Sequence, residues 1–352
     1  MNKVFFFTSS LAYGGKERQI IEVVKLLSKS FCISIYILNA KQQSFAASIA
    51  KDINFYYVSP ESKSIFSRIW SCYKTIRQGR PNLIHTMDAL STYLTFLPAL
   101  MNKIPSVNGS IRHAGVTHGF DYYFEQLSLY LSDYIIANSA AGLRHYNILN
   151  NRKAGVIYNF IDKSRFIENR SQSVAIVMTA NFTDYKDHKT FLTCAERLIK
   201  EKKIIRFNLL GDGPYTDKWK CWVREKGLAD NFTFHGKVSN VEELLAENSI
   251  GVLCSTRKYK EGISNSILEY MGSGLLTIAS DIGGTSEIIT NRVNGLLFEV
   301  ENPDSLYQNI IWALEHPDEC AQMVRSAYLT LDEKFSATKN CEILIDIYTQ
   351  LI

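Results

Sequence analysis

The stretch that most constrains the fold of this chain runs from residue 250 to residue 271, where an apolar segment, a glycine turn and an amphipathic segment follow one another. Ile250–Ser255 (IGVLCS) has the composition of a buried strand. Ile267, Leu268 and Met271 then fall on one side of a helical period. Glu261–Ile263 is therefore predicted to be a turn between a buried strand and a helix, which is where open parallel sheets bind their ligands.

This turn has the features of a site for a phosphorylated sugar. A helix that begins here directs backbone N–H groups and the positive end of its dipole at the turn, and phosphate is a common ligand of such helix starts. Gly262 allows a ligand to come close to the backbone. Two carboxylates, Glu261 and Glu269, frame the turn. Carboxylates beside a phosphate site favour a ligand that also carries hydroxyl groups, such as a sugar or a ribose joined to a diphosphate.

The spacing alone leaves simpler interpretations open. Ser266 and Glu269 have the Ser-x-x-Glu spacing of a helix capping box. Glu261 also fits a solvated loop residue beside Lys258 and Lys260.

Residues 261–269 (EGISNSILE) resemble the Glu–seven residues–Glu signature of glycosyltransferase family 4. Residues 281–287 (DIGGTSE) and 294–298 (NGLLF) are also similar to that family, and the resemblance covers nearly the whole chain. The family consists of retaining enzymes that use nucleotide-sugar donors. The resemblance implies an α/β chain with the GT-B fold, in which two Rossmann-like, doubly wound parallel-sheet domains face a cleft.

The length and the order of elements agree with this architecture. A chain of 352 residues is expected to form two domains, and the recurring strand–turn–helix order argues for two doubly wound parallel sheets. We expect residues 1–165 to form an N-terminal, acceptor-side domain and residues 166–334 a donor-binding domain. Residues 163–173 are read as the hinge, and residues 335–352 resemble the family's final helix, which crosses back onto the first domain.

The resemblance also assigns roles in the second half of the chain. Lys186 and the amides around the turn would neutralise the diphosphate, Glu261 would hold hydroxyls of the transferred sugar, and Glu269 would hold the ribose. Asn181 stands where relatives often have an arginine, so Lys186 would carry more of the charge stabilisation. The donor-binding set implied by the resemblance is Gly14, Gly15, Asn181, Lys186, Gly236, Val238, Glu261, Gly262, Ile263, Ser264, Asn265 and Glu269. A solvated lysine at a helix start remains the alternative for Lys186.

Two segments of the first half are candidate site loops. Gly14 and Gly15 follow a predicted strand, and a tight turn is the alternative to a contact with the donor. Arg112 and His113 follow another strand, at the point where relatives often place a histidine near the donor sugar. His113 is a candidate catalytic residue, and Arg112 is a candidate contact for the acceptor or for phosphate. The alternative is that both residues only stabilise their loop.

Composition limits the partners. The seven cysteines and seven histidines show neither disulfide nor metal-ligand spacing, so we expect no metal, no cofactor and a reducing cytoplasm. The start of the chain lacks the pattern of a signal peptide, and its longest apolar stretch is too short to span a bilayer. Residues 1–165 carry 19 Lys and Arg against 9 Asp and Glu, a net charge of +10, while the remainder carries −6.

The basic first half favours anionic partners, either lipid headgroups or a pyrophosphate-linked acceptor, with solubility as the alternative role of the charge. Residues 64–79 combine an apolar stripe with Arg68, Trp70, Lys74 and Arg77, which suit contact with the inner membrane surface from the cytoplasmic side or a solvated basic face. No nucleic acid is expected.

We therefore predict a glycosyltransferase that moves a sugar from a nucleotide-diphosphate sugar to a hydroxyl of a growing surface glycan on a lipid carrier. Among nucleotide sugars, a UDP-sugar is the expected donor. Two alternatives are a nucleotide-sugar 2-epimerase on the same fold and a non-catalytic nucleotide-sugar-binding subunit. The first would form product without an acceptor. The second would bind nucleotide without transfer, and its only support is the Asn at position 181.

Overall fold

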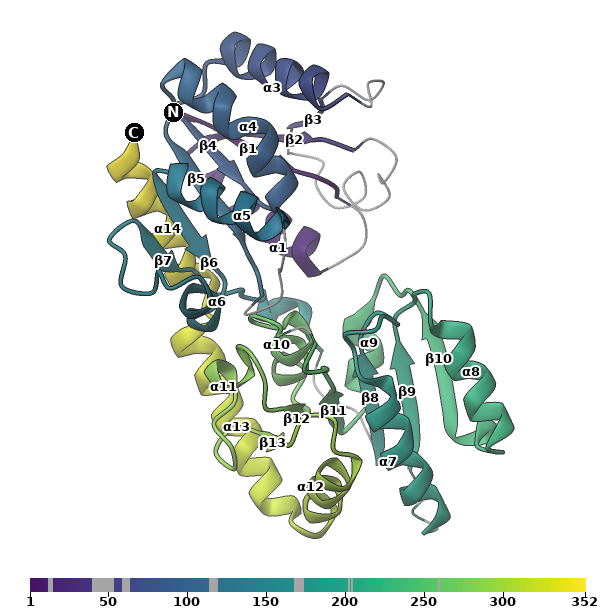
Figure 1. Ribbon diagram of the computed structural model, residues 1–352. Coiled ribbons are helices and arrows are strands. Elements are labelled where there is room, and N and C mark those ends of the chain that lie inside the picture. The colour runs from purple at the N-terminus through teal and green to yellow at the C-terminus, as the bar shows by residue number, and fades with distance from the viewer. Residues whose placement is uncertain are drawn as a thin grey trace. The chain divides into compact units, whose positions relative to one another are not determined.

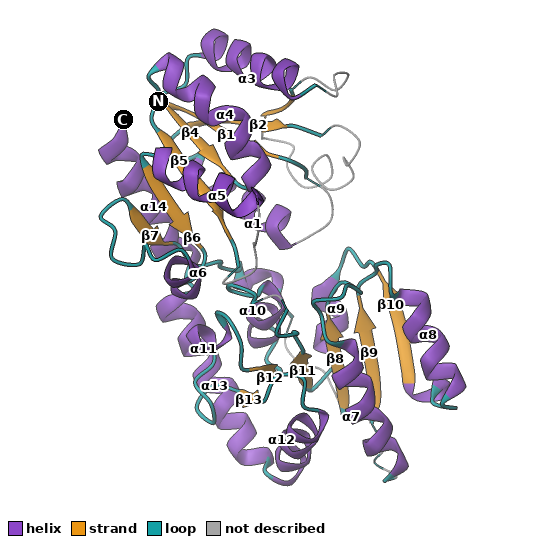
Figure 2. Ribbon diagram, in the orientation of Figure 1, coloured by secondary structure: helices purple, strands orange, loops and turns teal. Residues whose placement is uncertain are grey.

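The computed structural model describes residues 1–11, 15–39, 54–58, 64–113, 120–167, 174–201, 203, 205–258 and 260–352. The chain divides into two compact α/β units. The first comprises residues 1–112, 117–159 and 337–352, and the second comprises residues 113–116 and 160–336. Each unit has a parallel β-sheet with helices on its faces (Figure 1 and Figure 2). This confirms the predicted fold class.

The first unit contains a sheet with the strand order β3-β2-β1-β4-β5-β6-β7, all parallel. Its elements are β1 (Lys3–Thr8), α1 (Gly15–Leu27), β2 (Cys32–Ile37), β3 (Asn54–Tyr57), α3 (Ile65–Gly79), β4 (Leu83–Thr86), α4 (Ala89–Asn102), β5 (Ser106–Ile111), α5 (Phe120–Leu131), β6 (Tyr134–Ala137), α6 (Ala140–His145), β7 (Ala154–Val156) and α14 (Ala337–Leu351). Helices α3, α4 and α5 cover one face of the sheet, and α1 packs against α14 on the other (Figure 1).

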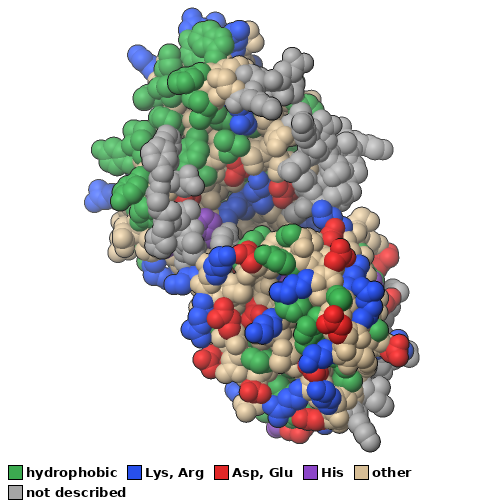
Figure 3. Space-filling view, turned by 45° about the vertical axis from the view of Figure 1, so that its right-hand side comes forward, with side chains coloured by type: hydrophobic (Ala, Val, Ile, Leu, Met, Phe, Trp, Pro, Cys, Tyr) green, Lys and Arg blue, Asp and Glu red, His purple; other side chains and the backbone are tan. Residues whose placement is uncertain are grey.

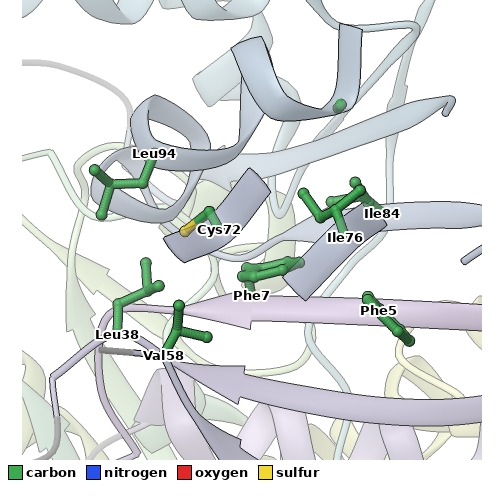
Figure 4. Packing of buried hydrophobic residues seen from close by; sticks show 9 residues of the cluster. Phe5, Phe7, Leu38, Val58, Cys72, Ile76, Ile84 and Leu94 are labelled. Carbon is green, nitrogen blue, oxygen red and sulfur yellow. The ribbon is translucent and has the colours of Figure 1, made fainter. Parts of the chain in front are cut away.

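The core of the first unit lies between the sheet and helices α3 and α4. Strand β1 is apolar and buried at its four central positions, as expected for a central parallel strand that is covered on both faces. Phe5 and Phe7 of β1 point to the same face and pack against Cys72 and Ile76 of α3 (Figure 4). Of the stripe predicted on α3, Ile76 is buried against the sheet and Ile69 packs on the edge of this core, whereas Ile65 is exposed.

The last helix belongs to the first unit. Tyr348 of α14 is fully buried, packs edge-on against Phe31 and forms a hydrogen bond with the ring Nδ1 of His85 on β4. The amide of Asn340 contributes a second tie, because its Oδ1 accepts a hydrogen bond of 3.1 Å from the backbone N–H of Tyr158. The second unit ends at residue 336, two residues beyond the predicted end of the donor domain.

The second unit contains a sheet with the strand order β10-β9-β8-β11-β12-β13, also all parallel. Its elements are the 3₁₀ helix η1 (Lys163–Arg165), β8 (Ala175–Thr179), α7 (His188–Lys200), β9 (Arg206–Leu210), α8 (Thr216–Glu225), the 3₁₀ helix η2 (Ala229–Asn231), β10 (Phe232–Gly236), α9 (Val241–Ala246), β11 (Ile250–Leu253), α10 (Asn265–Gly272), β12 (Leu276–Ser280), α11 (Thr285–Ile288), β13 (Leu296–Phe298), α12 (Pro303–Glu315) and α13 (Pro317–Lys334).

The start of the predicted hinge is part of the second unit. Arg165 forms an ion pair with Glu242 of α9, and Lys163 pairs with Asp332 of α13. Phe160 is buried in this unit. The unit boundary therefore falls at residues 159–160 rather than at 165–166, and residues 168–173 of the predicted hinge lie outside the described residues.

No helix in the described part of the chain is long and apolar enough to cross a bilayer.

Candidate active site

The site in the second unit lies where the direction of the sheet's winding changes. Strand β8 continues to β9 and β10 on one side, and β11 continues to β12 and β13 on the other. Loops that leave two such neighbouring strands diverge and leave a binding crevice at their carboxyl ends. Residues 180–187 follow β8, and residues 254–264 follow β11. These two loops carry most of the site residues predicted in this half.

Lys186 and Glu261 meet at this point. The Lys186 Nζ lies 2.5 Å from the Glu261 Oε2, and the exposed fractions of the two side chains are 10% and 25%. The hydroxyl of Ser255 is 3.5 Å from the same carboxylate oxygen. The sequence left open a solvated lysine at a helix start for Lys186 and a solvated loop residue for Glu261. Neither interpretation holds, because the Lys186 side chain is nearly buried before the start of α7 and Glu261 forms an ion pair with Lys186.

Backbone contacts fix Lys186 in place. It forms an isolated antiparallel bridge with Ser255. On either side of that bridge, the N–H of Asp187 donates to the carbonyl of Cys254 at 3.0 Å, and the N–H of Thr256 donates to the carbonyl of Tyr185 at 3.0 Å. The two loops are therefore joined across the switch point. Backbone hydrogen bonds fix the position of Lys186, and the ion pair with Glu261 fixes its ammonium group.

Helix α10 begins at Asn265, four residues after Glu261. Ser264 occupies the N-cap position, is almost fully buried, and makes no capping hydrogen bond with its side chain. Ser266 lies inside the helix, and its hydroxyl donates to the carbonyl of Thr179 on β8 at 2.8 Å. The capping box considered for Ser266 and Glu269 is therefore wrong, since Ser266 does not cap the helix. Glu269 is a buried carboxylate on α10, with only 6% of its surface exposed.

Glycines clamp the backbone of Glu261. The N–H of Gly284 donates to the Glu261 carbonyl at 2.8 Å. Gly283 has φ of +62°, and a Cβ there would lie 2.1 Å from the same carbonyl oxygen. A Cβ on Gly284 would lie 2.7 Å from the backbone of Gly262. The Gly-Gly pair thus has a local physical reason, which is the close approach of the β12–α11 loop to the Glu261 turn.

A second glycine loop supports Asn181. Gly211 has φ of +137°, and a Cβ there would lie 2.1 Å from the carbonyl oxygen of Ala180. The N–H of Gly211 donates to the carbonyl of Gly236 at 2.8 Å, so the ends of β9 and β10 are joined as well. The side chain of Asn181 is exposed, and Val238 is half-buried.

His113 groups with the second unit and forms an antiparallel backbone bridge with Glu261. The structure therefore brings together Glu261, Lys186 and His113, the three predicted catalytic residues. Arg112 groups with the first unit. Gly15 is the exposed first residue of α1, and Gly14 lies outside the described residues.

The first unit has a polar cluster at its own switch point, between β1 and β4. Asp88 follows β4, and its Oδ2 accepts hydrogen bonds from the backbone N–H and the hydroxyl of Ser9, both at 2.8 Å. The Lys16 Nζ lies 3.0 Å from the same oxygen. Burial would by itself raise the pKa of Asp88, but the charge of Lys16 and backbone hydrogen bonds from Ser9 and Ser91 hold it below its usual value.

Arg112 is electrostatically coupled to this cluster. Burial lowers the pKa of its guanidinium, and the carboxylates of Glu17 and Asp88 oppose that effect. Arg112 is among the site residues predicted from the sequence, whereas Lys16 and Asp88 are not. Asp88 had a local signal, since it precedes an apolar helix and has Ser91 three residues later, and its side chain does cap α4. Its meeting with Lys16 depends on the strand order, which the sequence does not contain.

Among the described residues, no group of three or more His, Cys, Asp and Glu side chains is arranged to hold a metal ion.

Family models match both halves of the chain. Residues 13–165 match the model described as "Glycosyltransferase Family 4", and residues 160–330 match that described as "Glycosyl transferases group 1".

Two curated proteins and one solved structure show the range of similarity. The chain is 22% identical to a Campylobacter jejuni enzyme named N-acetylgalactosamine-N,N'-diacetylbacillosaminyl-diphospho-undecaprenol 4-alpha-N-acetylgalactosaminyltransferase, over 90% of this chain and 91% of that protein. It is 26% identical to the Bacillus anthracis N-acetyl-alpha-D-glucosaminyl L-malate synthase, over 58% of this chain and 55% of that protein. The structure of Anabaena Alr3699/HepE in complex with UDP-glucose superimposes with a TM-score of 0.86, at 16% identity, covering 99% of this chain and 100% of that one.

Proposed function

Because the chain belongs to glycosyltransferase family 4 and is a transferase with the GT-B fold, we propose that it moves a sugar from a UDP-sugar to an acceptor hydroxyl with retention of configuration. The observation that carries this proposal is the Lys186–Glu261 pair beside the start of α10. One cation, one carboxylate and one helix N-terminus then surround the place where a sugar diphosphate would bind.

Cleavage of the bond between the sugar and the diphosphate leaves negative charge on the departing phosphate. Lys186 and the backbone at the start of α10 would stabilise that charge as it develops, and one preorganised donor of this kind is typically worth roughly 3–4 kcal/mol. Glu261 would accept hydrogen bonds from hydroxyls of the transferred sugar. Glu269, buried further along α10, would bind the ribose hydroxyls.

We propose that the cationic groups of the protein supply the charge that a divalent ion supplies in other transferases, so EDTA is expected to leave the rate unchanged. His113, held by its backbone beside Glu261, would contact the donor sugar. In the first unit, the cluster of Lys16, Asp88 and Arg112 would contact the acceptor or its phosphate groups.

The acceptor is proposed to be a lipid-linked glycan of a surface polysaccharide. The name of the Campylobacter jejuni relative specifies a diphospho-undecaprenol acceptor, and the basic first half of this chain suits such an anionic carrier. A protein that reaches a carrier of this kind would work at a membrane surface.

The test is a thermal-shift panel of UDP-, GDP- and ADP-sugars on Lys186→Ala and on a matched control, Lys189→Ala, whose side chain is exposed on the first turn of α7. We expect UDP-sugars to raise the Tm of the unmodified chain and of the control. Lys186→Ala is expected to reduce that shift and to lower the transfer rate by a factor of about 100 to 1,000.

Two outcomes would contradict the proposal. If no nucleotide sugar stabilises the protein, or if Lys186→Ala behaves as the control does, the donor assignment fails. Stabilisation without transfer to any lipid-linked acceptor would instead favour the non-catalytic binding subunit, whose support is the exposed Asn181 in the position where relatives often have an arginine.

A further inference from the structure

Helices α3, α4 and α5 of the first unit expose large apolar side chains side by side. The three helices adjoin one another, since α4 packs against both α3 and α5. We call the exposed apolar residues of these helices the α3–α5 face, and they are Ile65, Phe66, Trp70, Leu97, Leu100, Met101, Tyr123, Leu127, Tyr130 and Leu131. Figure 3 shows hydrophobic side chains gathered on the first unit.

Packing within the unit does not account for this face. Helix α3 already buries Cys72 and Ile76 against the sheet, while Phe66 on its outer side is 79% exposed. Tyr130 of α5 is 82% exposed. Among the described residues of the second unit, by contrast, the exposed large hydrophobic side chains are Tyr215, Val293 and Leu329. Contiguous exposed apolar surface on a folded protein commonly marks an interaction site.

The charges around the face are positive. The Lys74 Nζ lies 5.6 Å from the centre of the Trp70 ring, and the Arg77 guanidinium lies over the Tyr73 ring with a hydrogen bond of 2.7 Å to its hydroxyl. Lys103, at the end of α4, is exposed. Helices α3 and α4 contain no carboxylate, and the described carboxylate of α5, Glu125, is buried.

We propose that the α3–α5 face docks on the surface of an anionic lipid bilayer. Tryptophan and tyrosine suit the boundary between headgroups and acyl chains, because each has an apolar body and a polar tip. Lysine and arginine at the edge of the face would bind the headgroup phosphates while their stems lie along the apolar surface. No residue of the α3–α5 face belongs to the proposed donor site, so this docking does not depend on the donor assignment.

The charge pattern distinguishes a bilayer from a second copy of this chain. In a symmetric dimer the same surface would lie against itself, so each lysine and arginine of the face would meet a positive edge. The described side chains of the three helices offer no exposed carboxylate as a counterpart. An anionic lipid surface supplies the missing negative charge and accepts the apolar side chains as well.

The first test is sedimentation of the full chain with vesicles of neutral phosphatidylcholine, with and without 30% phosphatidylglycerol. We expect binding to the anionic vesicles that weakens as salt is raised. Phe66→Ser combined with Leu100→Ser is expected to lower the partition coefficient at least about tenfold, because two apolar side chains are lost. The control is Leu329→Ser, which removes an exposed leucine of α13 in the second unit.

The second test reverses charge. Lys74→Glu with Arg77→Glu is expected to weaken binding by at least about 25-fold, on the basis of roughly fivefold for each cation near an anionic surface. The matched control is Lys218→Glu with Arg325→Glu, which makes the same change in net charge in the second unit. Lys218 also lies over aromatic rings, at 4.6 Å from the centre of the Trp219 ring.

Each variant is first checked for a native thermal transition and for its response to the nucleotide sugar, which separates docking from donor binding. Absence of binding to the anionic vesicles would overturn the proposal, as would equal losses in the control variants. A different result would be that the unmodified chain dimerises and does not bind vesicles, and that Phe66→Ser with Leu100→Ser abolishes the dimer. That result would show that a second copy of the chain covers the face.

Discussion

At the scale of single residues, the central feature is a pair of opposite charges that the proposed donor would have to separate. Lys186 and Glu261 form an ion pair, and removing one partner from a largely buried pair leaves the other charge uncompensated. A sugar diphosphate can satisfy both at once, because its phosphates match the ammonium and its hydroxyls match the carboxylate. A ligand with only one of these groups would leave either the ammonium or the carboxylate without a partner.

Gly283 provides a residue-scale test of how the Glu261 turn is held. Its φ of +62° and the 2.1 Å separation of a built Cβ from the Glu261 carbonyl oxygen predict that Gly283→Ala displaces the turn. The control is Gly227→Ala, because Gly227 has φ of +68° and nothing within 4 Å of its built Cβ. We expect the control to lose about 1–2 kcal/mol of unfolding free energy and to keep its thermal response to the donor.

Gly283→Ala is expected to lose more stability than the control and to lose most of the donor response. Chemical denaturation and the thermal-shift panel measure the two effects. Equal losses in the two variants would show that backbone strain alone, rather than the contact with Glu261, makes the glycine necessary.

At the scale of elements, the sequence predicted those helices whose apolar stripe is complete. Residues 64–79 were expected to be helical, and α3 spans Ile65–Gly79. Helix α8 starts at Thr216 in a turn without an apolar stripe, where the N–H of Thr216 donates to the carbonyl of Gly213 at 3.1 Å. The positions of turns that depend on a distant backbone, such as the contact of Gly284 with Glu261, have no local signal.

The attachment of α14 to the first sheet predicts a dependence on pH. Burial lowers the pKa of His85 to about 3, against an ordinary value of 6.5, while its ring nitrogen holds the Tyr348 hydroxyl. Below pH 6.5 the unfolded chain takes up a proton that folded His85 does not. The free energy of unfolding should therefore fall as pH drops from 6.5 towards 3, and His85 should contribute about 1.4 kcal/mol per pH unit to that fall. Above pH 6.5, His85 should contribute no pH dependence.

The measurement is the unfolding free energy of the first unit by denaturant titration at several pH values, for the unmodified chain and for His85→Gln. The glutamine variant is expected to be less stable at pH 8 but to show a shallower decline between pH 6.5 and 4. Parallel curves for the two proteins would mean that His85 is not the group that titrates.

At the scale of the whole molecule, the chain repeats one design in two units, and each unit gathers charged side chains at its own switch point. In the second unit these are Lys186 and Glu261, and in the first they are Lys16 and Asp88. The first pair is predictable from the sequence, because Glu261 opens the family-like segment 261–269 and the resemblance also assigns a role to Lys186. The second was missed because β1 and β4 become neighbours only through the strand order, and no local pattern in either segment encodes that adjacency.

The most direct test of the proposed donor site is a crystal structure of the protein with a bound UDP-sugar. We expect the Lys186 Nζ to leave Glu261 and to lie within hydrogen-bonding distance of a diphosphate oxygen, at the start of α10. We also expect the sugar hydroxyls to contact Glu261 and the ribose hydroxyls to contact Glu269. A diphosphate bound away from residues 261–269, with the Lys186–Glu261 pair intact, would contradict the proposed site.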